Sequence, residues 1–309
     1  VLNDYIPNAK HIIEPFAGVG TTPINLAQMG ILSTYCEVNP VLRHLIEAKS
    51  ESLKYTPRTI FELDSLSKNL FDLSAAALPD SKLKENYSSC FKDSVYFNEI
   101  NFENILRLKS IERNLSKSTA SYFNISVISS LLQSSFLKRA GDVRFKTAKE
   151  ISKGIPDIRE IVSIKLKIIA NDLTEFVKIK KFTEPRLVKV NSKELVDISN
   201  LEADGVITSP PYLNGTNYFR NTRIELWYYE AIKDSSDLRK LRDTAVTAGI
   251  NDVTKNSALN VLPEVKEYHS NILKVCYDSR IPKMIAAYFN DMKQVFLGLR
   301  QNLKRDGIV

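Results

Sequence analysis

The sequence has few of the residues that build disulfide frameworks and metal sites. Its 309 residues include only three cysteines, which are far apart and form no CxxC pair: Cys36, Cys90 and Cys276. It also has only three histidines: His11, His44 and His269. This scarcity argues against a disulfide framework and a zinc site, and it favours a reducing compartment.

Long apolar runs are absent too. No run approaches the roughly 20 residues that a membrane-spanning helix requires, so no membrane association is expected. The first residues, VLNDYIPNAKH, lack the basic-then-apolar pattern of a secretory signal. The chain starts without Met, and its last residues, LKRDGIV, indicate a turn that enters a new strand. We therefore expect a cytoplasmic protein whose two ends are cut from a longer chain.

The net charge of +7 is concentrated in one segment. Residues 138–193 hold 15 Lys and Arg against 7 Asp and Glu, whereas the rest of the chain holds 28 against 29. A positive segment of this kind suits a polyanion such as nucleic acid. A solvated, Lys-rich helical face would have the same composition, so charge alone leaves both interpretations open.

The first fifty residues alternate between strand and helix patterns. HIIEPFA (11–17) predicts a strand, GVGTT a glycine turn, and PINLAQMG a helix that ends at Gly30. ILSTYCEV (31–38) predicts a second strand ending in Glu37, and a helix follows it. This order is typical of a parallel sheet with crossover helices.

The alternation then stops, and residues 51–186 show mainly helical patterning. Strand patterns return at RLVKVN (186–191) and DGVIT (204–208), and residues 234–262 look polar and weakly structured. A long helix precedes the last strand. The sequence therefore predicts an α/β core made of residues 1–50 and 187–309. Residues 51–186 would be an insertion too long for a simple loop.

The glycine turn lies in EPFAGVGTT, residues 14–22. Gly18 and Gly20 allow the backbone to turn sharply and to approach a ligand closely between a strand and a helix. The third glycine of a dinucleotide fingerprint is missing, and so is a phosphate-binding loop. Glu14 would repel a phosphate but could hold an ammonium group. Tight packing is the alternative explanation of the turn.

Glu37 follows Gly20 by 17 residues, at the end of the second strand. A carboxylate in that place can accept hydrogen bonds from both hydroxyls of a ribose. Alone, it could equally be a solvated acid. Together with Glu14 and the glycine turn, it favours a ligand that has a ribose and an amino acid but no phosphate. S-adenosylmethionine (SAM) fits that description.

The segment TSPPY, residues 208–212, ends the fourth strand in two prolines, which fix φ and cannot donate ladder hydrogen bonds. An exocyclic amino group of a base is a poor nucleophile because its lone pair is delocalised into the ring. Two acceptors, Ser209 Oγ and the Pro210 carbonyl, could accept hydrogen bonds from the amine and so release its lone pair toward the methyl sulfonium. Tyr212 would stack on the base. A simple strand-terminating turn is the alternative.

FAGVGTT followed by TSPPY resembles the amino-methyltransferase family of DNA modification enzymes, which methylate cytosine N4 or adenine N6. The resemblance implies a Rossmann-like class I methyltransferase fold, SAM as cofactor, and direct methyl transfer to a base flipped out of double-stranded DNA. The serine form of the tip is typical of the N4-cytosine enzymes, and the Asp or Asn form of the N6-adenine enzymes. The resemblance covers residues 11–50 and about 186–230.

The resemblance also implies roles for individual residues. The SAM site would contain Glu14, Phe16, Gly18, Gly20, Thr21, Glu37 and Asn191. The catalytic tip would consist of Ser209, Pro210, Pro211 and Tyr212, and the substrate contacts of Tyr212, Tyr218 and Arg220. Asn191 stands where many members have an Asp that contacts the adenine amino group. The helical pattern around Trp227 and Tyr228 favours a core position for both rings.

The resemblance predicts a bacterial or archaeal, nucleoid-associated modification enzyme, with a cognate restriction nuclease as a candidate partner. Insertion 51–186 could contact DNA through its basic end, FLKRAGDVRFKTAKE, or could serve as a scaffold. An RNA- or protein-directed enzyme is disfavoured by Ser209, and a C5-cytosine enzyme by the lack of a cysteine after a proline. A nucleic-acid-binding module with an inactive methyltransferase fold is the alternative from another class.

Overall fold

The structure, a computed structural model, describes residues 2–51, 57–176, 182–213, 218–254 and 260–309. The chain folds into two compact units. The sheet unit comprises Val1–Arg43, Lys181–Asn217 and Lys240–Val309. The helical unit comprises His44–Lys180 and Tyr218–Arg239. The insertion boundaries at residues 51 and 186 stay a prediction, and the helical unit also takes in the residues that follow the TSPPY segment.

The sheet unit contains one sheet of five strands within the described residues, in the order β5-β2-β1-β6-β7. Its neighbouring strands all pair in parallel. The strands are β1 (His11–Glu14), β2 (Leu32–Cys36), β5 (Arg186–Lys189), β6 (Ala203–Val206) and β7 (Leu303–Ile308). The predicted parallel α/β sheet is therefore confirmed, and β5, β2, β1 and β6 direct their carboxyl ends to one edge.

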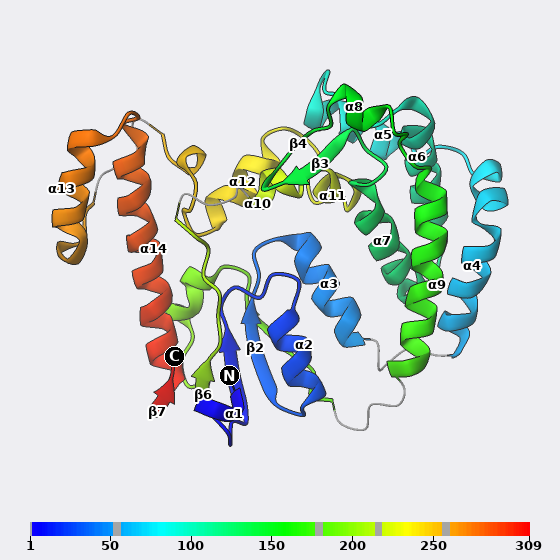
Figure 1. The fold of residues 1–309 in the computed structure, drawn as a ribbon. Helices are drawn as coiled ribbons and strands as arrows, with labels where there is room; N and C mark the ends of the chain where they lie inside the picture. The colour runs from blue at the N-terminus through cyan, green and yellow to red at the C-terminus, as the bar shows by residue number, and fades with distance from the viewer. Residues whose placement is uncertain (1, 52–56, 177–181, 214–217, 255–259) are drawn as a thin grey trace. The chain divides into compact units, whose positions relative to one another are not determined.

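Glycines delimit the first long helix of the sheet unit, and another long helix lies beside its last strands. Helix α2 begins after Gly20 (φ 81°) and is followed by Gly30 (φ 75°), as the glycine pattern predicts. Helix α14 runs alongside β6 and β7 (Figure 1). The helices of the sheet unit are α1 (Leu2–Tyr5), α2 (Thr21–Gln28), α13 (Lys266–Val275) and α14 (Arg280–Asn302). Two further helices, α3 (Pro40–Glu51) and α12 (Asp237–Thr244), each begin in one unit and end in the other.

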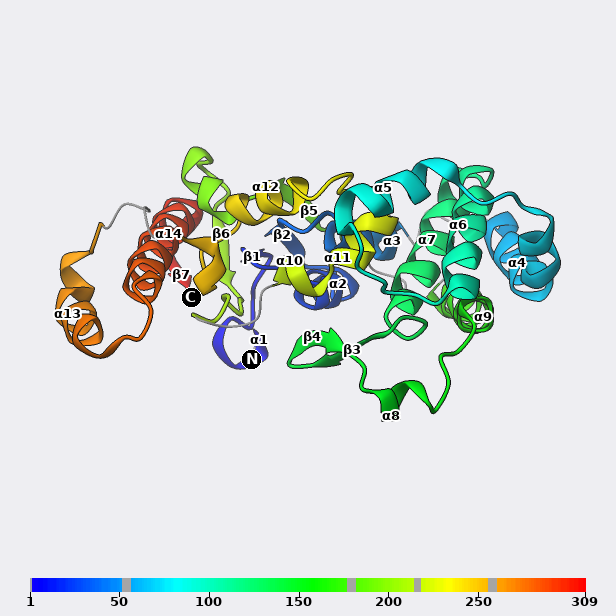
Figure 2. The same cartoon turned by 90° about the horizontal axis from the view of Figure 1, so that it is seen from above.

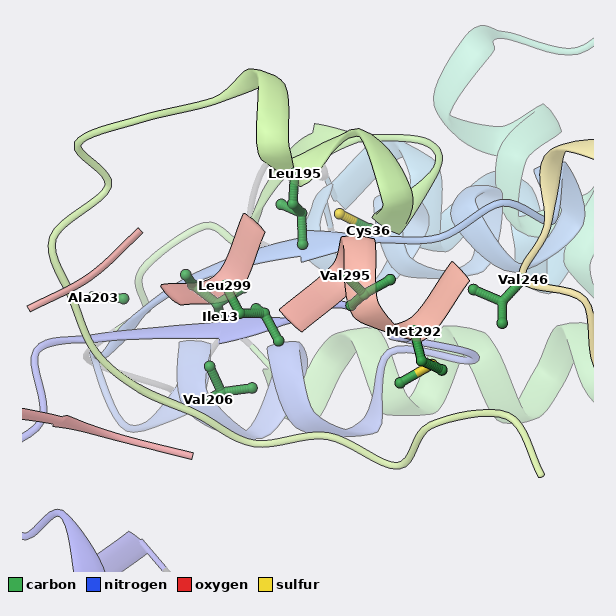
Figure 3. Packing of buried hydrophobic residues seen from close by; sticks show 9 residues of the cluster. All are labelled: Ile13, Cys36, Leu195, Ala203, Val206, Val246, Met292, Val295 and Leu299. Atoms are coloured by element: carbon green, nitrogen blue, oxygen red, sulfur yellow. The ribbon is translucent and has the colours of Figure 1, made fainter. Parts of the chain in front are cut away.

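The core of the sheet unit joins α14 to the strands (Figure 3). Its buried side chains are Ile13, Cys36, Leu195, Ala203, Val206, Val246, Met292, Val295 and Leu299. A Cβ on Gly298 would lie 2.6 Å from Cβ of Leu195, which belongs to the short 3-10 helix η2 (Ser192–Asp197). A glycine in α14 therefore lets that helix approach η2 closely.

The helical unit consists mainly of α-helices that pack against one another. Several of them begin at a polar residue that caps the helix. Asp80, Asn98 and Ser116 accept backbone hydrogen bonds at the starts of α5, α6 and α7. These caps satisfy amide donors that the helices leave without a partner. The helices are α4 (Pro57–Ala76), α5 (Ser81–Phe91), α6 (Glu99–Arg113), α7 (Lys117–Leu131), α8 (Ala148–Ile151), α9 (Ile158–Phe176), α10 (Tyr218–Asn221) and α11 (Arg223–Tyr228).

The aromatic residues of α11 are core residues, as expected. Trp227 and Tyr228 are fully buried, and the Trp227 indole N–H donates to the Leu83 carbonyl at 3.1 Å. Tyr87, Phe91, Phe97 and Phe102 surround the indole ring with centroids between 5.0 and 6.3 Å away. Aromatic clusters of this kind contribute strongly to the packing of a core.

Two parts of the chain depart from the sequence-based expectation. The basic end of the insertion contains an antiparallel hairpin, β3 (Leu137–Ala140) and β4 (Asp142–Phe145), within a segment expected to be mainly helical. The stretch 234–262, expected to be weakly structured, contains α12 and the 3-10 helix η3 (Ile250–Asp252). Nowhere in the described ranges is there a helix long and apolar enough to cross a membrane.

Candidate cofactor and substrate site

The sheet order brings together motifs that are nearly 200 residues apart in the sequence. Strand β1 lies between β2 and β6, with Glu14 paired to Tyr35 and Ile13 paired to Val206. Beyond the ladder, the Ile207 N–H donates to the Ile13 carbonyl at 3.2 Å. The glycine turn after β1, the acid after β2 and the TSPPY segment after β6 therefore leave the same edge of the sheet on adjacent strands.

The glycine turn has room for a ligand. Gly18 has φ 56°, and a Cβ built on it would meet nothing within 4 Å. The turn is fixed at both ends, because the Ala17 N–H donates to the Cys36 carbonyl at 3.0 Å and the Gly20 N–H to the Ala17 carbonyl at 2.8 Å. The open space above Gly18 fits a bound cofactor that lies close to the backbone, since any side chain here would enter that space.

Glu37 connects the end of β2 to the glycine turn. Its carboxylate accepts one hydrogen bond from the Gly18 N–H and one from the Asn39 N–H, each at 2.7 Å. The side chain is buried, and burial raises its pKa to about 7 against the effect of these hydrogen bonds. Each oxygen uses one lone pair for these bonds, so each can still accept a hydrogen bond from a ligand hydroxyl.

Glu14 is the second buried acid at this edge. One carboxylate oxygen accepts the Phe16 N–H at 3.1 Å. Burial raises its pKa to about 7, and the nearby hydroxyls of Thr208 and Thr22 act in the opposite direction. Thr208 Oγ1 is buried and makes no hydrogen bond of normal geometry with any described residue, so the Thr208 hydroxyl acts on Glu14 without forming a regular hydrogen bond to it. A bound ammonium group would favour the ionised form of Glu14.

The TSPPY tip is held from one side and open on the other. The Tyr288 hydroxyl of α14 donates to the Pro211 carbonyl at 3.0 Å. Ser209 is exposed, and neither its hydroxyl nor the Pro210 carbonyl makes a hydrogen bond to any described residue. The Tyr212 ring is 70% exposed. Two acceptors and an aromatic ring therefore stand at the end of β6 without partners of their own in the described part of the chain.

The remaining predicted cofactor residues have mixed surroundings. Phe16 packs against the core of the sheet unit, and Thr21 is exposed at the first position of α2. Asn191 follows β5 and caps η2, where its side-chain oxygen accepts the Lys193 N–H at 3.0 Å. The cap occupies one lone pair of Asn191, so its predicted contact with an adenine amino group would use the other.

The predicted substrate residues are divided between the units. Tyr212 belongs to the sheet unit, whereas Tyr218 and Arg220 lie on α10 of the helical unit, where both are exposed. Residues 214–217, the NGTN part of the loop that resembles the target-base border, lie outside the described residues. The pocket role of Tyr218 and Arg220 stays a prediction.

Three residues of this site were not predicted from sequence. Tyr288 reaches the tip from 77 positions away, which no local pattern indicates. Thr22 influences Glu14 from the first turn of α2. Asn39 donates its backbone N–H to Glu37, and the Asn-Pro pair at 39–40 is a recognisable helix-start signal that could have indicated it.

The parallel sheet, its strand order and the glycine turn after the first core strand define a Rossmann-like α/β fold, the class to which class I methyltransferases belong. The chain is similar to the Type II methyltransferase M.BsoBI of Geobacillus stearothermophilus, with 24% identity over 301 residues. That alignment covers 89% of this chain and 56% of the relative, so the chain spans about half the length of the relative. No protein-family model and no solved structure matches the chain.

Proposed function

We propose that the chain is the catalytic part of a SAM-dependent DNA methyltransferase that modifies an exocyclic amino group of a base. Cytosine N4 is the preferred target, and adenine N6 is the alternative. The observation that carries the proposal is a pair of acceptors, Ser209 Oγ and the Pro210 carbonyl, which have no partner among the described residues. They lie at the end of the strand next to the one that leads into the glycine turn. The similarity to a Type II methyltransferase supports it.

The cofactor side of the proposal rests on Gly18, Glu14 and Glu37. SAM supplies an activated methyl group when bound. The open space above Gly18 would accommodate its amino-acid part, and Glu14 would hold the ammonium group. Glu37 would accept the ribose hydroxyls through its two remaining lone pairs. Asn191 would accept a hydrogen bond from the adenine amino group of SAM through its side-chain oxygen.

The substrate side rests on the rigid tip. Ser209 Oγ and the Pro210 carbonyl would accept hydrogen bonds from the two N–H groups of the amine, and the nitrogen lone pair would then localise on nitrogen and become available to the methyl group. The Tyr212 ring would stack on the base, which must leave the duplex to reach the tip. Because the prolines and Tyr288 hold the tip in place, little ordering is needed when the base arrives.

The preference for cytosine rests on Ser209, since the serine form of the tip resembles the N4-cytosine enzymes. The wider proposal includes double-stranded DNA as substrate, a DNA-contacting role for residues 51–186, and a cognate restriction nuclease as partner. An inactive DNA-binding module is the alternative function, and the intact set of Glu14, Gly18, Glu37 and Ser209 argues against it.

The test measures transfer of radiolabelled methyl groups from SAM to mixed genomic DNA, followed by mass spectrometry of the nucleosides. We expect N4-methylcytosine. Detection of N6-methyladenine alone would overturn the cytosine assignment. The variant Ser209→Asn then tests whether residue 209 determines which base is methylated. A protein that binds DNA but neither binds SAM nor transfers methyl groups would contradict the enzyme proposal.

A further inference from the structure

The β3–β4 hairpin is a two-stranded ribbon that belongs to no larger sheet among the described strands. Its strands pair in antiparallel register from Leu137 opposite Phe145 to Ala140 opposite Asp142, and Gly141 makes the turn with φ 76°. Figure 2 shows the ribbon at the edge of the helical unit. A hairpin of this size is marginally stable alone, so its conformation depends on anchors outside it.

Asn221 provides such an anchor from α10. Its side-chain oxygen accepts the Val143 N–H at 2.8 Å, and its side-chain nitrogen donates to Asp142 at 3.0 Å. At the base of the ribbon, the Phe145 ring stacks on Tyr96 with centroids 5.7 Å apart. The ribbon is therefore held by α10, the first helix after the TSPPY segment.

The anchored ribbon exposes cations on both faces. Only Leu137 and Val143 of its eight strand residues are buried. Lys138 and Arg144 lie directly opposite each other, an arrangement that repels unless an anion intervenes. Glu150 provides it, at 2.8 Å from each cation, and these two cations hold the pKa of its carboxyl well below the usual range. Two cations share one acid, so this face keeps a positive charge.

Arg139 lies opposite Val143, on the ribbon face that also carries the two buried residues Leu137 and Val143. It is exposed and makes no hydrogen bond or ion pair with any described residue. Its charge lowers the pKa of the buried acid Glu225 of α11 against the larger effect of burial. An exposed arginine on an anchored ribbon is available for a bidentate contact with a phosphate or a base edge.

We propose that the β3–β4 hairpin is a docking element for duplex DNA, with Arg139 as its leading contact and the Lys138–Arg144 pair on the backbone phosphates. An antiparallel two-stranded ribbon has a shape that fits the major groove. The positive charge complements the phosphates, and the anchoring by Asn221 reduces the ordering that binding requires. The choice of DNA as the polyanion rests on the proposed function.

The test compares Arg139→Ala with Arg58→Ala, an 82% exposed arginine on α4 of the same unit. Binding of a labelled mixed-sequence duplex is measured over a range of salt concentrations. We expect Arg139→Ala to weaken binding about tenfold and to reduce the salt slope by about one, whereas Arg58→Ala leaves both unchanged. Arg139→Lys should restore much of the affinity for this non-specific duplex, since it keeps the charge.

The hairpin proposal would be overturned if Arg139→Ala and wild type bound DNA with equal affinity. Thermal unfolding curves must show that both proteins are folded. Methyl transfer measured in parallel separates it from the proposed function. Methylation by the wild type with no effect of Arg139→Ala on DNA binding rejects the hairpin alone. Hairpin-dependent DNA binding without any methyl transfer rejects the enzyme and leaves the docking element in place.

Discussion

The Tyr288 hydroxyl donates a hydrogen bond of 3.0 Å to the backbone carbonyl of Pro211. Tyr288 belongs to α14, and its ring also packs against the core of the sheet unit. The carbonyl next to it in sequence, that of Pro210, is left without a partner among the described residues. One carbonyl of the tip therefore holds its position, and the other is available to a substrate.

Removal of this hydrogen bond should slow methyl transfer without weakening cofactor binding. We expect Tyr288→Phe to lower the single-turnover rate about fivefold, because a neutral hydrogen bond is worth about 1 kcal/mol. SAM affinity, measured by calorimetry, should stay unchanged. Tyr277→Phe is the control, since Tyr277 is 90% exposed. A loss of SAM affinity that matches the loss of rate would contradict a positioning role.

Removal of the Ser209 hydroxyl should affect chemistry more strongly. We expect Ser209→Ala to reduce the rate of methyl transfer on the order of 100-fold, because one of the two acceptors for the amino group is lost. SAM affinity should be nearly unchanged, since the proposed partner of this hydroxyl is the base and not the cofactor. Ser199→Ala, at an exposed serine before β6, is the control. An unchanged rate would show that the Pro210 carbonyl acts without Ser209.

A side chain at Gly18 should block the cofactor site. Gly18→Val places a branched side chain in open space, so we expect loss of SAM binding by calorimetry. Gly154→Val is a matched control, because Gly154 also has a positive φ (92°) and open space around its Cβ position. Both variants should lose about 1–3 kcal/mol of stability from backbone strain. Normal SAM binding by Gly18→Val would refute the cofactor assignment.

Glu225 should make the helical unit less stable as pH rises. Burial raises its pKa from 4.5 to about 7, so the folded state retains a proton that the unfolded state releases. Its contribution is complete below pH 4.5 and is lost as pH rises through about 7, with a total of about 3 kcal/mol. Glu225→Gln cannot ionise and should remove this slope.

Urea unfolding at pH 5.5 and pH 8 measures the effect. Between pH 5.5 and pH 8, wild type should lose more free energy of unfolding than Glu225→Gln does. Glu85→Gln, at an exposed position of α5, should leave the difference between the two pH values unchanged. Parallel curves for Glu225→Gln and wild type would mean that the carboxyl is not buried in its neutral form.

The sheet and the glycine turn could be predicted from the sequence because the patterns that indicate them are local. Strand β1 contains the buried apolar pair Ile12 and Ile13, and β2 ends in the buried Tyr35 and Cys36. Gly18 and Gly20 occupy backbone positions with positive φ. The strand order was not accessible. Placement of β6 beside β1 depends on pairing of residues nearly 200 positions apart, for which one sequence holds no local signal.

The hairpin and α12 were missed for a different reason. Lys138, Arg139 and Arg144 mask the short alternation of β3 and β4, in which only Leu137 and Val143 are buried. Asn221 and Tyr96 anchor the ribbon from outside its own strands. Helix α12 is strongly charged and has no buried residue, so apolar periodicity could not indicate it. The Tyr288 contact was also hidden, since it follows from tertiary packing.

The helical unit is built from two stretches of chain that are separated by residues of the sheet unit. The indole of Trp227, from the second stretch, bonds to Leu83 of the first, and the Tyr228 hydroxyl donates to Glu112 of the first at 2.8 Å. Recombination that exchanged only the longer stretch between relatives would break both contacts. Because both contacts join the two stretches, a protein in which only the longer stretch is exchanged should unfold at a lower temperature than one in which both stretches are exchanged together.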